Sequence, residues 1–282
     1  MAEIVGGIGV SHAPSLARAY DQGLGREPEW RDVFAMFEPA AEWLADLAPD
    51  ALVVIYNDHV NRFFFDAYPT FALGVASDYA QADEGWGLRP LPDLGGDSEL
   101  GWHVARSLVR DEFDPTICQE LDVDHGVYSV LPFLAPPPWA TPIVPLAVNV
   151  IQHPLPTPRR LHRLGGALRR AVESFDDERR VVVIATGGMS HQLHGKDFGY
   201  VAPEWDNRFL DLLTSDPAQL CELDHLDFME RGGAESVEVI MWLAMRGAMG
   251  DRVRVAHRAY AAPMLTGYGV ICMEPSGVDL TA

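Results

Sequence analysis

The sequence predicts an α/β fold in which a central mixed sheet is flanked by helices and the active site lies at the carboxyl ends of the strands. Short apolar runs alternate with longer segments of helical periodicity along most of the 282 residues, as in strands that are connected by helices. The run from Val181 to Ile184 is entirely β-branched and lacks polar alternation, which indicates a central strand buried on both faces. We expect a single catalytic domain over residues 1–282 with a frayed tail over 275–282.

Five strands are predicted from short apolar runs. In chain order they cover residues 3–10, 51–56, 143–150, 181–185 and 269–273. Five helices are predicted from apolar residues that recur at intervals of three and four. In chain order they cover residues 32–47, 98–113, 158–175, 204–213 and 234–249. Asp97 offers an N-cap oxygen to the second helix, and Pro158 suits the first turn of the third.

The segment 58–96 differs from the rest of the chain because it is rich in aromatic residues, glycine and proline. Loops of this length in a compact domain usually cover or form a functional site. Trp86 and Arg89 within it could line a pocket for an aromatic acid, or they could simply cover the core. The aromatic stretch 63–68 suggests a surface that is covered in an oligomer.

Acidic side chains outnumber basic ones by 41 to 21, which gives a formal net charge of −20. This charge repels nucleic acid and anionic membranes, so we expect neither as a partner. No apolar run approaches the roughly 20 residues of a membrane span. Cys118, Cys221 and Cys272 are widely spaced, which predicts neither a disulfide framework nor a thiolate zinc site and suggests a cytoplasmic protein.

Three histidines directly follow predicted strands. His12 lies in GVSHAP, His59 in IYNDH and His191 in ATGGMSH. Open α/β sheets bind ligands beyond the carboxyl ends of their strands, so these side chains would converge if the three strands are neighbours. Each histidine alone could be a capping or hydrogen-bonding residue, but the shared placement, with His125 in DVDHG as a fourth, favours one common site. The other histidines are expected on the surface or on helices: His103, His153, His162, His194, His225 and His257.

A metal held by two imidazoles needs an anionic ligand, and Glu235 and Glu238 lie three residues apart in the helical stretch 234–249. Glu238 has apolar neighbours on both sides, where an unpaired charge would cost of order 3 kcal/mol or more and a cation would remove that cost. The alternative is that Glu238 shares a solvated face with Glu235. Two histidines and one carboxylate suit non-haem Fe(II), but zinc accepts the same ligands with a water.

Several ordered segments carry a family resemblance. They are VSHAPSL, VIYNDH, PTFALG, ADEGWGLRPLPD, DVDHG, ATGGMSHQLHG and ESVEVIMWLAMRGA, spread from about residue 8 to 249. On these segments the chain resembles the class III extradiol ring-cleavage dioxygenases, of the type of the catalytic β subunit of protocatechuate 4,5-dioxygenase.

The resemblance assigns roles to the residues of the common site. It implies that His12, His59 and Glu238 ligate Fe(II). It also implies that His191 is the catalytic acid and base, and that His125 contacts the substrate hydroxyl or bound oxygen. Asn57, in the NDH segment, would lie beside the substrate.

The implied activity is Fe(II)-dependent extradiol cleavage of a catecholic aromatic acid such as protocatechuate by O2, which gives a carboxy-hydroxymuconic semialdehyde. Relatives that act on protocatechuate carry a serine that helps bind the ring carboxylate, whereas this chain has Met264 and Leu265 near that place, with Thr266 as the candidate substitute. The substrate could therefore be gallate or 3-O-methylgallate. A zinc-dependent hydrolase with the same ligands is the alternative from another class. The resemblance also makes a small helical α subunit a possible partner.

Overall fold

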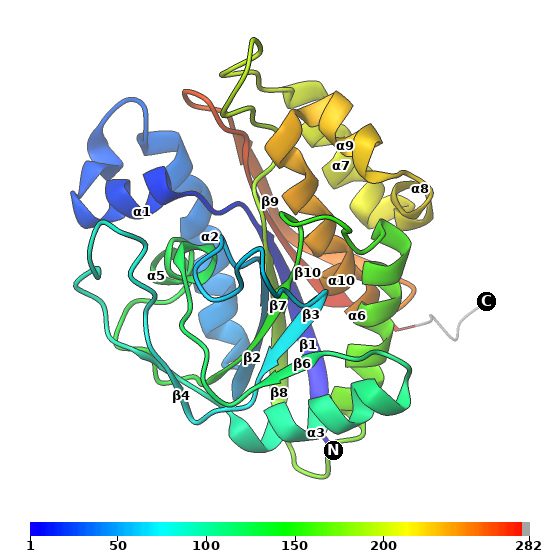
Figure 1. The fold of residues 1–282 in the computed structure, drawn as a ribbon. Helices are drawn as coiled ribbons and strands as arrows, with labels where there is room; N and C mark the ends of the chain where they lie inside the picture. The colour runs from blue at the N-terminus through cyan, green and yellow to red at the C-terminus, as the bar shows by residue number, and fades with distance from the viewer. Residues whose placement is uncertain (278–282) are drawn as a thin grey trace.

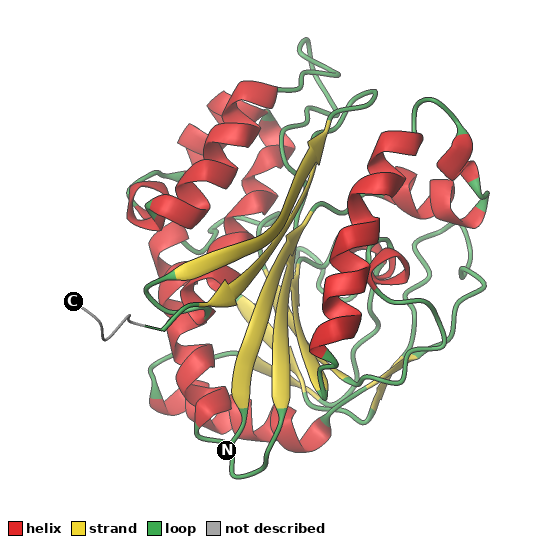
Figure 2. Ribbon diagram, turned by 180° about the vertical axis from the view of Figure 1, so that it is seen from behind, coloured by secondary structure: helices red, strands yellow, loops and turns green. Residues whose placement is uncertain are grey.

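The computed structural model describes residues 1–277 of the chain, and over these residues an eight-stranded mixed sheet lies between two groups of helices (Figures 1 and 2). The strand order is β6-β3-β7-β2-β8-β1-β10-β9. The predicted α/β architecture with a central mixed sheet is therefore confirmed.

Four parallel strands form the centre of the sheet. In spatial order they are β7 (Ile143–Val148), β2 (Ala51–Tyr56), β8 (Arg180–Thr186) and β1 (Glu3–Val10). Every residue of β2 and β7 is buried, and in β8 only Arg180 is exposed. The unbroken apolar run of β8 thus corresponds to a strand with neighbours on both sides and helices on both faces.

The outer strands add three antiparallel pairs to this core, together with the parallel pair β3–β6. These strands are β3 (Phe71–Gly74), β6 (Thr116–Cys118), β9 (Val253–Ala261) and β10 (Tyr268–Pro275). β3 runs antiparallel to β7, and β10 runs antiparallel to β1. A separate two-stranded ribbon consists of β4 (Asp78–Tyr79) and β5 (Leu94–Gly95).

Each face of the sheet packs against its own hydrophobic cluster of helices. One face carries α3 (Ser98–Arg110), α6 (Pro158–Glu173), α7 (Pro203–Ser215), α8 (Pro217–Cys221), α9 (His225–Gly232), η2 (Ala234–Met241) and α10 (Trp242–Ala248). The other face carries α1 (Pro14–Asp21), η1 (Leu24–Arg26), α2 (Arg31–Leu47), α4 (His125–Tyr128) and α5 (Leu131–Leu134). The expected caps are present, since Asp97 accepts from the backbone N–H of Leu100 and Pro158 opens α6. None of the described helices is long and apolar enough to cross a membrane.

The single helix predicted over 234–249 is wrong in its first half. Residues Ala234–Met241 form the 3₁₀ helix η2, and only Trp242–Ala248 is α-helical. A 3₁₀ helix has about three residues per turn, so residues three apart lie on the same side of it. Apolar spacing does not distinguish the two helix types over so short a stretch.

The strands β3, β4, β5, β6 and β9 were not predicted. β9 lies at the edge of the sheet and reads VRVAHRAYA, so its half-exposed residues give no apolar run. His257, expected on the surface or on a helix, lies in this strand. Of the tail expected to fray over 275–282, Pro275 is the last residue of β10 and pairs with Val253 of β9, and residues 278–282 lie outside the described part of the chain.

Candidate metal centre

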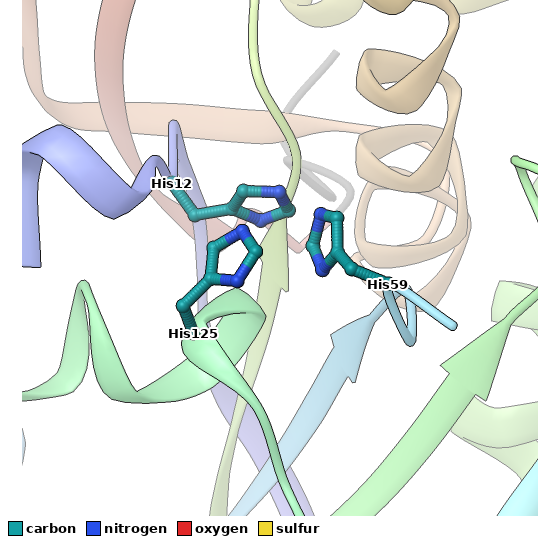
Figure 3. A group of neighbouring side chains, drawn as sticks. All are labelled: His12, His59 and His125. Atoms are coloured by element: carbon teal, nitrogen blue, oxygen red, sulfur yellow. The ribbon is translucent and has the colours of Figure 1, made fainter. Parts of the chain in front are cut away.

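The predicted site residues converge because the strands that precede them are neighbours. β1, β8 and β2 are adjacent and parallel, so the loops after them, which carry His12, His191 and His59, meet at one edge of the sheet. Together with His125 and Glu238, these histidines line one pocket of about 620 Å³. The rings of His12, His59 and His125 are turned toward one another (Figure 3). Their nearest nitrogen atoms lie within 4.8 Å of each other.

Glu238, on η2, faces two of these histidines. Its Oε2 lies 3.2 Å from His12 Nε2, and its Oε1 lies 3.6 Å from His59 Nε2. Two ligands of one ion at about 2.1 Å and near a right angle are separated by about 3 Å, so this spacing suits a shared metal ion. Glu238 is only 8% exposed, and the alternative of a solvated face for it is therefore wrong.

The outer nitrogen of each imidazole is held by a hydrogen bond. His12 Nδ1 lies 3.0 Å from Thr186 Oγ1 on β8. His59 Nδ1 lies 3.0 Å from Asp124 Oδ2, which also accepts from the backbone N–H of His59 at 2.7 Å. Such outer contacts fix the ring and its tautomer, as they do for histidines that bind metals. His12 Nε2 is buried without a hydrogen-bond partner, and a cation between it and Glu238 would satisfy it.

The charges in the pocket also fit a cation. Burial lowers the pKa of His12 to about 4, against the opposing effect of Glu238. Burial also lowers the pKa of His59, but the carboxylates of Asp124 and Glu238 outweigh it and raise that pKa to about 10. Burial opposes ionisation of Glu238, yet the two histidines hold its pKa well below the usual range. A proton on His59 thus balances the carboxylates, and a divalent metal would replace that proton.

Glu84 fixes the fourth imidazole and was not singled out from the sequence. Its Oε1 accepts from the backbone N–H of His125 at 2.9 Å, and its Oε2 lies 2.5 Å from His125 Nδ1. The His125 ring stacks against His59 with 3.8 Å between ring centroids. The signals for Glu84 were its place in the long segment 58–96, which was expected to be functional or covering, and in the family segment ADEGWGLRPLPD.

The hydrogen bond of His191 fixes which of its ring nitrogens carries the proton in the neutral form. Its Nδ1 donates to the backbone carbonyl of Met189 at 2.8 Å, because a carbonyl oxygen can only accept. In the neutral ring the lone pair is therefore on Nε2. An isolated β-bridge pairs His191 with Thr266, so these two predicted site residues are neighbours, and both line the pocket.

Asn57, which is expected beside the substrate, lies next to two of the candidate metal ligands. It is fully buried, and its Nδ2 lies 3.0 Å from His59 Nε2 and 3.4 Å from Glu238 Oε1. It is not among the residues that line the pocket. Its amide therefore contacts the atoms of His59 and Glu238 that would face the metal ion.

Two histidines that were expected on the surface or on helices, His153 and His194, also line the pocket. His194 Nδ1 lies 2.6 Å from Glu235 Oε1, and the other carboxylate oxygen of Glu235 accepts from the backbone N–H of Leu193 at 3.0 Å. Glu235 thus holds the loop after His191, while Glu238 faces the histidines. Sequence spacing alone could not separate these two roles.

Trp86 and Arg89 line an adjoining pocket of about 650 Å³ that shares Ser15 and His125 with the first. Arg89 is bound to both carboxylate oxygens of Asp21, at 2.8 Å each. Trp86 is exposed, so it does not cover the core.

A family model matches most of the chain. The family model described as the catalytic LigB subunit of aromatic ring-opening dioxygenase matches residues 6–271. A gallate dioxygenase from Pseudomonas putida is 45% identical over 195 residues, which cover 68% of this chain and 57% of that protein. The chain therefore spans less than two thirds of that relative.

More distant matches extend over more of the chain. A 2,3-dihydroxyphenylpropionate/2,3-dihydroxicinnamic acid 1,2-dioxygenase from Rhodococcus jostii is 29% identical over 292 residues, which cover 85% of this chain and 90% of that protein. Among solved structures, the uncharacterized protein JW3007 from Escherichia coli K12 shares the fold. It has a TM-score of 0.56 and 16% identity, and the match covers 95% of this chain and 99% of that one.

Proposed function

The chain belongs to the family of catalytic LigB subunits of aromatic ring-opening dioxygenases, and we propose that it catalyses Fe(II)-dependent extradiol cleavage of a catecholic aromatic acid, with gallate as the first candidate substrate. The observation that carries this proposal is the buried set of two imidazoles and one carboxylate at the strand ends of a chain of this family. The similarity to gallate dioxygenase favours gallate over protocatechuate, the substrate that the sequence alone placed first. The family match also argues against the zinc hydrolase alternative.

We assign His12, His59 and Glu238 as the Fe(II) ligands. His125 is close enough to compete for this role, but its Nδ1 is held by Glu84 and its ring stacks on His59. Glu238 is preferred because it supplies a negative charge and faces the Nε2 atoms of both other ligands. Two histidines and one carboxylate with open positions are the arrangement of non-haem Fe(II) oxygenases.

Bound Fe(II) would supply the redox chemistry and the open positions for both catechol oxygens and O2. His191 Nε2 accepts a proton from a catechol hydroxyl, and the Met189 carbonyl keeps the other proton on Nδ1. The Nδ1 of His125 is held by Glu84, and His125 lines the pocket, so its remaining nitrogen would be the one to contact the oxygen atoms of the substrate. We assign Thr266 to the ring substituent, because it pairs with His191 and lines the same pocket. Both oxygen atoms enter the opened ring, so no external reductant is needed.

The test is anaerobic reconstitution with Fe(II), followed by oxygen uptake with gallate, 3-O-methylgallate, protocatechuate and 2,3-dihydroxyphenylpropionate. We expect one O2 per molecule of catechol, a coloured ring-opened product, and the highest kcat/KM with gallate. Protein loaded with Zn(II) should take up no O2. Protein that holds iron but consumes no O2 with any of the four catechols would contradict the proposal. If a small helical subunit completes the site, turnover should rise when that subunit is added. If a second copy of this chain completes it, turnover per chain should rise with protein concentration.

Replacing Asp124 by asparagine should weaken Fe(II) binding by about 10- to 100-fold, the usual effect of removing an outer partner of a metal-bound histidine. The asparagine amide removes the charge that faces His59 Nδ1. Iron affinity can be measured by competition with a chelator under anaerobic conditions. The matched control is Asp122→Asn, two residues earlier and exposed to solvent, which should leave the affinity unchanged. Equal affinities for the two variants would argue against a role of Asp124 in holding His59.

A further inference from the structure

A second polar network lies beneath His191, outside the proposed metal ligands. Its centre is Asp206 on α7, which is 2% exposed. Asp206 Oδ1 accepts from the backbone N–H of Ser190 at 3.0 Å. Its Oδ2 accepts from Ser190 Oγ at 2.5 Å and from the Tyr260 hydroxyl at 2.7 Å. All three donors are neutral, and none of the ion pairs within residues 1–277 includes Asp206.

A buried carboxylate without an ion pair is costly, because its desolvation is not offset by an opposite charge. Burial accordingly raises the pKa of Asp206, while hydrogen bonds from Ser190 and Tyr260 and the nearby His191 lower it. A neutral side chain at this position would avoid the desolvation cost, yet the chain has an aspartate there. A role of the Asp206 carboxylate in holding Ser190 and Tyr260 would account for its presence.

The network reaches His191 through the backbone. Ser190 directly precedes His191, and its Oγ accepts from the backbone N–H of Ala202, at the start of α7, at 2.8 Å. The carbonyl oxygen of Ser190 accepts from the backbone N–H of Gly267 at 2.9 Å. The loop after β8 is therefore held by α7 and by the segment that carries Thr266, while Tyr260 of β9 binds the carboxylate of Asp206.

The packing at this point allows little movement. A Cβ atom at Gly267 would lie 2.3 Å from Asp206 Oδ2, so only glycine fits there without displacing the carboxylate. The backbone of Gly267 and the carboxylate of Asp206 are thus in close contact. A shift of Asp206 would be passed directly to Ser190 and to the neighbouring His191.

We propose that Asp206 is a positioning residue for the reaction, which holds Ser190 and so fixes the imidazole of His191 against the substrate. The inference rests on the proposed function, since it assigns His191 the proton transfer. Among the described residues, the side chain of Asp206 forms hydrogen bonds with Ser190 and Tyr260 and not with the proposed metal ligands, and it does not line the pocket. It acts by limiting the freedom of the loop that presents His191 Nε2, and Thr266 is held by the same contacts.

The central test compares Asp206→Asn with Tyr260→Phe. Asparagine keeps the shape of the side chain, but its amide N–H₂ cannot accept a hydrogen bond, so one of the two bonds to Ser190 is lost. Tyr260→Phe removes a bond to the same carboxylate and leaves both bonds to Ser190 in place. We expect Asp206→Asn to lower kcat with gallate by about 10- to 100-fold, within the range that acid–base positioning contributes, while KM and iron content stay within about twofold of wild type. Tyr260→Phe should lower kcat by less than about threefold.

Hydrogen–deuterium exchange of the iron-free proteins gives a readout that does not depend on turnover. The amides of Ser190 and Gly267 should exchange at least about tenfold faster in Asp206→Asn than in Tyr260→Phe, because the first variant releases the loop and the second does not. Ser190→Ala, which removes the hydroxyl but keeps the backbone bond, should give an intermediate result and serves if Asp206→Asn does not fold.

Unchanged exchange in both Asp206→Asn and Ser190→Ala would overturn the inference. A kcat that falls equally in Asp206→Asn and Tyr260→Phe, or only in proportion to lost iron, would overturn it too, because a merely structural carboxylate would give that result. Failure of the proposed function would appear differently, as an iron-loaded wild-type protein without oxygen uptake. The exchange experiment remains informative in that case.

Discussion

Replacing Glu238 by alanine is expected to abolish tight Fe(II) binding, with a loss of affinity of more than about 100-fold, the upper range found for outer partners of metal ligands. Glu238 is the carboxylate that faces both His12 Nε2 and His59 Nε2. Without it, the ion would have two neutral imidazoles and no charge to balance its own. Iron content after anaerobic reconstitution, together with a chelator competition, measures the effect.

Glu235→Ala is the matched control, since Glu235 lies three residues earlier on the same side of η2. Its carboxylate binds the backbone N–H of Leu193 and the ring of His194 instead of the two histidines. This variant should hold iron as tightly as the wild type. Glu238→Gln, which keeps the shape and removes the charge, should resemble the alanine variant. If Glu235→Ala loses iron and Glu238→Ala retains it, the ligand assignment is wrong.

Replacing His191 by alanine should lower kcat by about 10²- to 10⁴-fold, the usual contribution of a general acid–base group. Iron content should not change, because the side chain is held by the Met189 carbonyl and none of its nitrogens contacts Glu238 within ion-pair distance among the described residues. Single-turnover measurements with iron-loaded protein separate loss of proton transfer from loss of metal.

His194→Ala provides the comparison for the second prediction. His194 lies in the same loop and lines the same pocket, but its side chain is 70% exposed and is bound to Glu235. The His194→Ala variant should retain most of the wild-type kcat. Loss of iron from the His191 variant would instead identify His191 as a ligand, and equal kcat values for the two variants would remove its role in proton transfer.

The fold and the position of the site could be predicted from the sequence because the signals were local. The β-branched run of β8 identified a central strand, and His12, His59 and His191 each follow a strand directly. Only the order of β1, β8 and β2 in the sheet, which brings these histidines together, needed the structure. Glu238 was recognisable because a charge among apolar neighbours predicts burial.

The supporting residues could not be predicted, because they act across long stretches of chain. Glu84 reaches His125 from 41 residues away, and Asp124 reaches His59 from 65 residues away. Asp206 lies in a helix whose sequence is that of an ordinary amphipathic helix. Edge strand β9 was missed for another reason, since its half-exposed positions give no apolar pattern.

The 3₁₀ geometry of η2 determines which changes in chain length this protein can accept. In such a helix, one added or deleted residue rotates everything after it by about 120°. An insertion between Gly233 and Glu238 would therefore swing the carboxylate away from His12 and His59, although every residue of the site would still be encoded. Gene variants or designed chimeras must therefore keep the length of this stretch, and differences in loop length between natural relatives are expected to fall elsewhere.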